Sequence, residues 1–400
     1  MKAVVWHGYG DIRLDTVAEP KVEQPTDAIV RVTTSAICGT DLHMVRGTLS
    51  GMEPGRILGH EAVGVVEQVG AGVRNLRPGD RVIVPSTIAC GYCSYCRAGY
   101  YAQCDVAAPP NGTAFFGGPQ SAGGYDGLQA EYARVPFANV GLVPVPDEVS
   151  DDDAILISDI FPTGWQAARM ADVHRGDTVA VLGCGPVGQF AIASAQLQGA
   201  GRVIAVDGIA DRLEMARNQN AEVVDFNVEH PAEVIKELTG GIGVDRIIDA
   251  VGVDAERPKS GPAAEEASQQ RDEFDRERAQ VAPDAAPQGQ LWKPGDAPSM
   301  ALQWAVQAVA KAGTVSIIGV YPPTMTRFPI GQAMMHNLTV KMGNCNHRKY
   351  IPMLVEYARS GRARPGRLLT QKEPLTGAVE AFTTFDRRPA GWTKVALEAG

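Results

Sequence analysis

The sequence has no uninterrupted apolar run long enough to cross a bilayer. Its first seven residues run straight into a strand-like pattern and lack the apolar core and small-residue cleavage site of a signal peptide. The chain also lacks an excess of positive charge, because its net charge at pH 7 is -9. Nucleic acids and anionic membranes favour a clustered positive surface, so we expect neither as a partner and expect a cytoplasmic protein.

Cysteine is scarce and unevenly distributed. The 400 residues include seven cysteines, and four of them lie between positions 90 and 104. In a chain without an export signal, an odd and clustered set favours metal ligation by reduced thiolates over disulfides. The chain is too long for one ordinary hydrophobic core, so we expect two domains.

The first part of the chain reads as β-rich. Alternating segments at 30–33, 64–69 and 80–84 are separated by turn signals such as Pro78-Gly79, which predicts an irregular domain of barrel type. From residue 177 strands and helices alternate, which is typical of a parallel sheet with helices on its faces.

Two short motifs in the β-rich part carry metal-ligand chemistry. Cys38 precedes Thr40 and His43, so a thiolate, a hydroxyl and an imidazole lie close together in the sequence. The plainer interpretation of a lone cysteine is a small buried hydrophobe. His60 and Glu61 are either a buried histidine with an ordinary charged neighbour or a pair near one cation, and we favour the metal site.

Four cysteines have the spacing of a closed zinc site. Cys90, Cys93 and Cys96 are separated by two-residue spacers, and Cys104 follows eight residues later. Four sulfurs complete a tetrahedral zinc site without an open position, so this zinc is expected to be structural. The alternatives are an iron–sulfur cluster and chance clustering.

Asp159 stands among apolar neighbours, where an unpaired carboxylate is costly to bury. It is either a cap for the following helix or a ligand for the zinc of Cys38 and His60. We take the ligand as the sharper hypothesis.

A glycine-rich loop follows the apolar strand expected at 178–182. Gly183, Gly185 and Gly188 form a Gly-x-Gly-x-x-Gly pattern that encloses Pro186 and Val187. Glycines at these places let the backbone approach a pyrophosphate at a helix N-terminus. A strand, this loop, a helix and a second strand in that order predict a dinucleotide site.

Asp207 ends the second strand, 19 residues beyond Gly188. A carboxylate there accepts hydrogen bonds from the adenosine ribose hydroxyls and repels a 2′-phosphate, so we expect NAD rather than NADP. Arg212 leaves three alternatives open: it admits a 2′-phosphate, pairs with Asp207, or covers the adenine.

Residues 254–298 interrupt the strand–helix alternation. They are rich in charge, alanine, proline and glutamine, and 263–281 is compatible with a solvent-facing helix. The insertion is a mobile surface loop, a cover for the cofactor or a subunit contact.

Together these motifs, in this order, resemble the zinc-containing medium-chain dehydrogenase/reductases, the alcohol dehydrogenase superfamily. The resemblance implies an α/β protein. A GroES-like β-rich catalytic domain would occupy 1–160 and 321–400, with a structural zinc lobe at about 88–106. A Rossmann NAD-binding domain with a doubly wound parallel sheet would occupy 161–320 and carry the insertion.

The resemblance also implies roles for the candidate residues. Cys38 and His60 become ligands of a catalytic zinc, and Thr40 with His43 becomes a proton relay. The third ligand, usually a cysteine in the family's alcohol dehydrogenases, falls on Asp159. This departure is similar to the glutathione-independent formaldehyde dehydrogenases and their aldehyde-dismutating relatives.

Two further residues are candidates for roles at the site. Lys394 matches a basic residue near the cofactor pyrophosphate through the resemblance. Glu61, because it lies beside His60, is expected to act at the catalytic zinc, where it swings in when a ligand leaves. Family habit implies a homo-oligomer, a tetramer rather than a dimer.

The main functional hypothesis is a dehydrogenase with NAD and two zinc ions per chain that acts on a small alcohol or aldehyde. The alternative is a formaldehyde dehydrogenase or aldehyde dismutase that retains its NAD. A non-catalytic zinc- and nucleotide-binding protein belongs to another class, and the intact motifs disfavour it.

Overall fold

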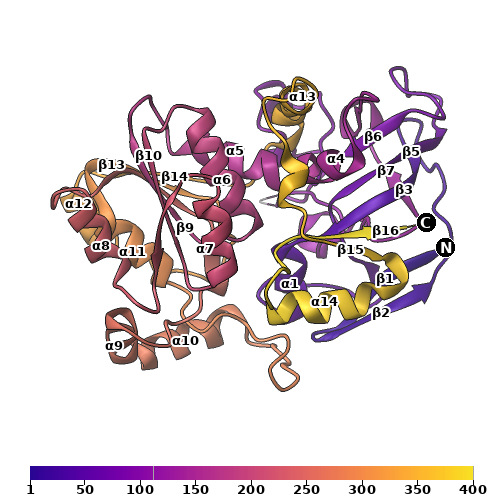
Figure 1. Ribbon diagram of the computed structural model, residues 1–400. Coiled ribbons are helices and arrows are strands. Elements are labelled where there is room, and N and C mark those ends of the chain that lie inside the picture. The colour runs from indigo at the N-terminus through magenta and orange to yellow at the C-terminus, as the bar shows by residue number, and fades with distance from the viewer. Residues whose placement is uncertain (111, 400) are drawn as a thin grey trace. The chain divides into compact units, whose positions relative to one another are not determined.

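The computed structural model describes residues 1–110 and 112–399, which form two compact units (Figure 1). Unit 1 comprises residues 1–162, 284–293 and the chain from Cys345 to the C-terminal end. Unit 2 comprises residues 163–283 and 294–344. Each helix in the described ranges is too short or too polar to span a membrane.

Unit 1 is built on a seven-stranded sheet with the strand order β15-β16-β3-β5-β6-β8, and β7 also pairs with β3. Alternating valines of the central strands point into one core, because successive side chains of a strand face opposite ways. The strands are β3 (Ala28–Ile37), β5 (Ala62–Val69), β6 (Arg81–Val84), β7 (Tyr132–Val135), β8 (Val143–Pro144), β15 (Gln371–Pro374) and β16 (Val395–Glu398).

A second, three-stranded sheet of unit 1 has the order β2-β1-β4. Its strands are β1 (Lys2–Gly8), β2 (Asp11–Thr16) and β4 (Arg56–Ile57). The helices of this unit are α1 (Gly39–Arg46), α2 (Ser94–Arg97), α3 (Ala138–Gly141), α4 (Asp151–Ser158), α13 (His347–Arg359) and α14 (Ala378–Arg387). The expected β-rich fold is confirmed.

Unit 2 is built on a six-stranded parallel sheet with the order β11-β10-β9-β12-β13-β14. Alternate residues of β9 and β10 point to opposite faces, where α6 and α7 cover one face and α8 and α11 the other. The strands are β9 (Thr178–Leu182), β10 (Arg202–Asp207), β11 (Glu222–Asp225), β12 (Val244–Asp249), β13 (Val309–Ile317) and β14 (Thr339–Met342). This is the expected doubly wound sheet.

The helices of unit 2 follow the strands in alternation. They are α6 (Pro186–Leu197), α7 (Ala210–Arg217), α8 (Pro231–Leu238), α9 (Pro262–Gln269), α10 (Arg271–Val281), α11 (Met300–Ala308) and α12 (Ile330–Met335). One further helix, α5 (Ile160–Met170), begins in unit 1 and continues into unit 2.

The second domain boundary differs from the expected one. Residues 321–344 belong to unit 2, because β14 adds a sixth strand beside β13 with Thr339 opposite Thr314. The prediction ended the sheet at β13. β14 is only four residues long and largely exposed, so no buried apolar run marks it in the sequence.

The insertion is not a surface loop. Its expected helix is divided into α9 and α10, which bury Ala263, Ala267 and Phe274 in the core of unit 2. Residues 284–293 belong instead to unit 1, where the indole of Trp292 is buried in the core. The polar composition of the segment concealed these few anchoring side chains.

Candidate metal centres and nucleotide loop

Four side chains of unit 1 meet at the candidate catalytic centre. Ligand atoms of Cys38, His60, Glu61 and Asp159 all lie within 4.8 Å of one another, and all four residues are buried. Sulfur, imidazole nitrogen and carboxylate oxygen are the donors that zinc takes in proteins. The structure therefore brings the four residues together as one cluster.

Strand pairing explains this meeting. β3 and β5 are antiparallel neighbours with Ser35 opposite Ala62. Cys38 follows the end of β3, and His60 with Glu61 precedes the start of β5, so the three residues lie at the same end of the strand pair. Asp159 stands between α4 and α5, and α4 packs against both strands.

The centre fits a cation better than a set of hydrogen bonds. The Asp159 Oδ2 atom lies 3.6 Å from the Cys38 Sγ atom and 3.3 Å from the His60 Nε2 atom. Neither ring nitrogen of the buried His60 makes a well-formed hydrogen bond, nor does the Oε1 atom of Glu61. Buried polar atoms without such bonds are costly. A zinc ion would satisfy the His60 Nε2 atom, which faces Asp159, whereas the Nδ1 atom faces Asp41.

The pKa shifts of these residues follow from the burial of several ionisable side chains close to one another. Burial raises the pKa of the Cys38 thiol and, against the effect of Lys394, raises the pKa of Glu61 to about 7. Burial alone would also raise the pKa of Asp159, but the neighbouring imidazoles of His347 and His60 bring it well below its usual value. A bound cation reverses the effect of burial, because it stabilises thiolate and carboxylate.

Sequence reasoning assigned no role to Asp41, although it lies within the Cys38–His43 motif. Its Oδ1 atom is 3.0 Å from the His60 Nδ1 atom, and its Oδ2 atom accepts hydrogen bonds from the Cys38 amide and the Gln129 side chain. A carboxylate on the far nitrogen of a ligand imidazole fixes the orientation of the ring. Asp41 is thus placed to orient His60.

The expected relay residues Thr40 and His43 lie on α1, three residues apart, which places them on one face of the helix. The His43 Nδ1 atom lies 2.7 Å from the Thr48 hydroxyl, which fixes the imidazole ring.

Lys394 lies beside the candidate catalytic centre. Its ammonium group is buried, forms an ion pair with Glu61 and donates to the Ile37 carbonyl at 3.0 Å. Lys394 reaches Glu61 because β16 pairs with β3 next to the motif of Cys38. The expected contact with a cofactor pyrophosphate stays a prediction.

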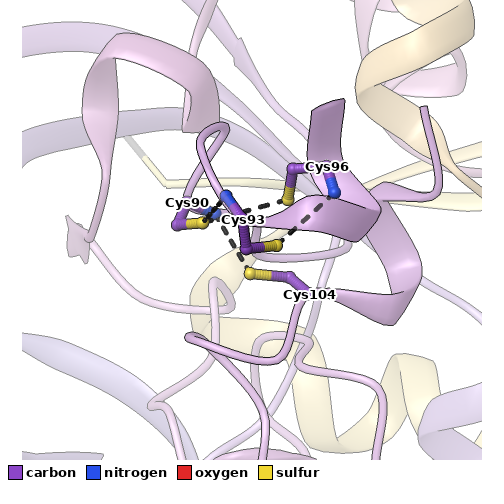
Figure 2. Close-up of side chains that lie close together, drawn as sticks. All are labelled: Cys90, Cys93, Cys96 and Cys104. Carbon is purple, nitrogen blue, oxygen red and sulfur yellow. Dashed lines mark hydrogen bonds between the residues drawn. The ribbon is translucent and has the colours of Figure 1, made fainter. Parts of the chain in front are cut away.

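The four clustered cysteines form the second centre. Their sulfur atoms lie within 4.8 Å of one another, and all seven cysteines of the chain are free of disulfides. Backbone amides of Tyr92 and Cys93 donate to the Cys90 sulfur, and those of Cys90 and Ala107 donate to the Cys104 sulfur. Figure 2 shows the four thiols directed toward one another. Such N–H···S bonds stabilise thiolates, and four sulfurs suit a closed zinc site.

The glycine loop has the shape that a nucleotide site requires. Gly183 has a φ of 84°, and a Cβ atom on Gly188 would lie 1.8 Å from the Gly183 carbonyl oxygen. A Cβ atom on Gly185 would meet no protein atom closer than the Arg212 Nη1 atom at 3.7 Å. Backbone conformation therefore favours glycine at position 183, and close packing requires it at position 188. Gly185 instead leaves open space for a ligand. Pro186 and Val187 open α6 directly behind it.

Asp207 lies at the end of β10 beside this loop. Its carboxylate accepts hydrogen bonds from the backbone amides of Cys184, Gly208 and Ile209. These bonds hold the side chain at the carboxyl edge of the sheet, where parallel sheets bind ligands.

A β-rich unit with two zinc-compatible centres and a doubly wound unit with a nucleotide loop define a zinc-dependent dehydrogenase. Family models agree: residues 24–147 match the alcohol dehydrogenase GroES-like domain, and residues 186–260 match the zinc-binding dehydrogenase domain.

Individual relatives agree as well. An uncharacterized zinc-type alcohol dehydrogenase-like protein of Bacillus subtilis is 39% identical, with 100% of both chains covered. The alcohol dehydrogenase of Thermus sp. ATN1 is 34% identical with a TM-score of 0.81, covering 100% of this chain and 99% of that one. A glutathione-independent formaldehyde dehydrogenase of Pseudomonas aeruginosa is 38% identical over 64% of this chain and 66% of its own.

The chain belongs to the zinc-containing alcohol dehydrogenase superfamily. It is an oxidoreductase that depends on zinc and uses a nicotinamide cofactor.

Proposed function

We propose that the protein is an NAD-dependent dehydrogenase of small alcohols or their aldehydes, with two zinc ions in each chain. The cluster of Cys38, His60 and Asp159 carries the proposal, because it offers a thiolate, an imidazole and a carboxylate in one buried place. The four cysteines Cys90, Cys93, Cys96 and Cys104 would hold the second, structural zinc.

When bound, the catalytic zinc supplies a Lewis acid that lowers the pKa of a substrate hydroxyl, and NAD supplies a hydride acceptor. Cys38, His60 and Asp159 would hold the metal, and Asp41, 3.0 Å from the far nitrogen of His60, would orient the His60 ring. Glu61 lies beside these ligands and would bind the metal when another ligand leaves. The ammonium group of Lys394 compensates the negative charge of the Glu61 carboxylate.

Thr40 and His43 would carry the substrate proton away from the centre. Their shared helix face and the hydrogen bond between the His43 ring and the Thr48 hydroxyl support this role. A positioned hydroxyl and imidazole are suitable groups for general acid–base transfer.

The glycine loop Gly183–Gly188 would receive the pyrophosphate, and Asp207 would favour NAD by repelling a 2′-phosphate. Arg212 lies close to Gly185, so it also adjoins the proposed phosphate position.

We also propose a homo-oligomer, a tetramer in preference to a dimer, in a cytoplasmic setting that keeps the free thiols reduced. Four large apolar side chains of unit 2 support a self-contact, since they are 63–81% exposed on and beside α12 and β14. They are Ile330, Met334, Met335 and Met342.

A second function keeps the site and changes the reaction. If NAD is retained, one aldehyde is oxidised and a second is reduced on the same cofactor. The partial similarity to the formaldehyde dehydrogenase and the carboxylate at position 159 favour this alternative.

Cofactor retention separates the two functions. We expect protein purified without added cofactor to release little NAD on denaturation and to reduce added NAD in the presence of a primary alcohol. The measurement is the NAD content per chain, with aldehyde turnover followed in the absence of added NAD. Near-stoichiometric NAD together with dismutation would replace the dehydrogenase by the dismutase.

A further inference from the structure

A histidine far away in the sequence binds one oxygen of the proposed zinc ligand. His347, the first residue of α13, is buried, and its Nε2 atom lies 2.6 Å from the Asp159 Oδ1 atom. The other ring nitrogen, Nδ1, is 3.1 Å from the hydroxyl of the buried Thr87. These contacts orient the imidazole ring toward Asp159.

The two oxygens of Asp159 consequently have different partners. A carboxylate accepts hydrogen bonds, so the His347 Nε2–H group donates to Oδ1. Oδ2 is the oxygen that faces the Cys38 sulfur at 3.6 Å and the His60 Nε2 atom at 3.3 Å.

We propose that His347 is a positioning residue that makes Asp159 a single-oxygen donor to the catalytic zinc. The inference rests on the proposed function and deepens it. A thiolate offers a metal one atom, whereas a carboxylate can offer two. With Oδ1 bound by His347, Asp159 would supply one oxygen and would leave a metal position open to substrate. Partners behind ligating side chains tune metal binding in this way.

Replacing zinc by cobalt provides the test. The visible absorption of Co²⁺ is intense when the ion has four ligands and weak when it has more. We would load wild type, His347→Ala, His347→Gln and His347→Asn with cobalt, and titrate each against a competing chelator. Glutamine keeps an amide N–H near the position of Nε2, whereas the shorter asparagine does not reach it.

We expect His347→Ala and His347→Asn to bind cobalt at the catalytic centre 10- to 100-fold more weakly, with weaker visible bands. His347→Gln should recover most of both properties, and the four-cysteine site should retain its metal throughout. Should His347→Ala fail to fold, the contrast between glutamine and asparagine decides the question.

Asp159→Ala, measured in parallel, separates two kinds of failure. If it loses catalytic metal while all three His347 variants behave as wild type, the positioning role of His347 is wrong and the metal site stands. If Asp159→Ala also keeps its catalytic metal, the ligand assignment itself is wrong.

Discussion

The Asp159→Ala variant is expected to contain one zinc ion per chain where the wild type contains two. The substitution removes the only proposed ligand that comes from the α4–α5 junction, and it leaves the four-cysteine site intact. Loss of the Lewis acid costs several kcal/mol of transition-state stabilisation, so kcat/KM should fall by about 1000-fold or more. Metal analysis and alcohol-dependent NADH formation measure the two effects.

A matched control lies on the same helix. Asp152 is a partly exposed carboxylate of α4 that forms a surface ion pair with Lys372. Asp152→Ala should keep both zinc ions and near-wild-type activity, because exposed pairs contribute little. Two zinc ions in Asp159→Ala would contradict the assignment of this carboxylate.

The Trp292→Ala variant is expected to destabilise unit 1 by about 3–5 kcal/mol, the cost of deleting a large buried aromatic side chain. The indole is packed in the same core as Trp6, Leu42 and Phe382. The backbone amide of Trp292 donates to Asp386, whose carboxylate also binds Arg46 at the end of α1. This core supports the helix that carries Thr40 and His43.

Thermal unfolding and hydrogen exchange measure this effect. At about 2–4 °C per kcal/mol, the transition of unit 1 should fall by roughly 6–20 °C, and the amides of α1 and α14 should exchange faster. Gln290→Ala is the control, since Gln290 is exposed in the same segment. An unchanged transition in Trp292→Ala would show that the Trp292 indole contributes nothing to the stability of unit 1.

Local motifs made the fold classes and most candidate ligands predictable. The four clustered cysteines and the glycine loop lie within a few residues of their motif partners, so their spacing indicates their chemistry. The motif of Cys38 became informative only together with the other motifs and the resemblance that they carry. Asp159 needed more. Its apolar neighbours marked it as unusual, and the resemblance to a known family then suggested its role.

The contacts that could not be predicted from the sequence depend on packing between residues far apart in the chain. His347 lies 188 positions from Asp159, and no spacing rule joins them. The ion pair between Lys394 and Glu61 likewise depends on strand pairing between distant parts of the chain. Trp292 stands in a polar insertion, where composition indicates a surface loop, whereas its side chain completes a core.

Hydride transfer from a small alcohol is the most direct test of the proposed function. Zinc-loaded protein would be mixed with a panel of short primary alcohols and NAD, and NADH would be followed by its absorbance, with aldehydes and NADH tested in reverse. The proposal predicts alcohol-dependent NADH formation that disappears when the zinc is removed and in Asp159→Ala. Zinc-loaded protein that is inert toward the whole panel in both directions would contradict it.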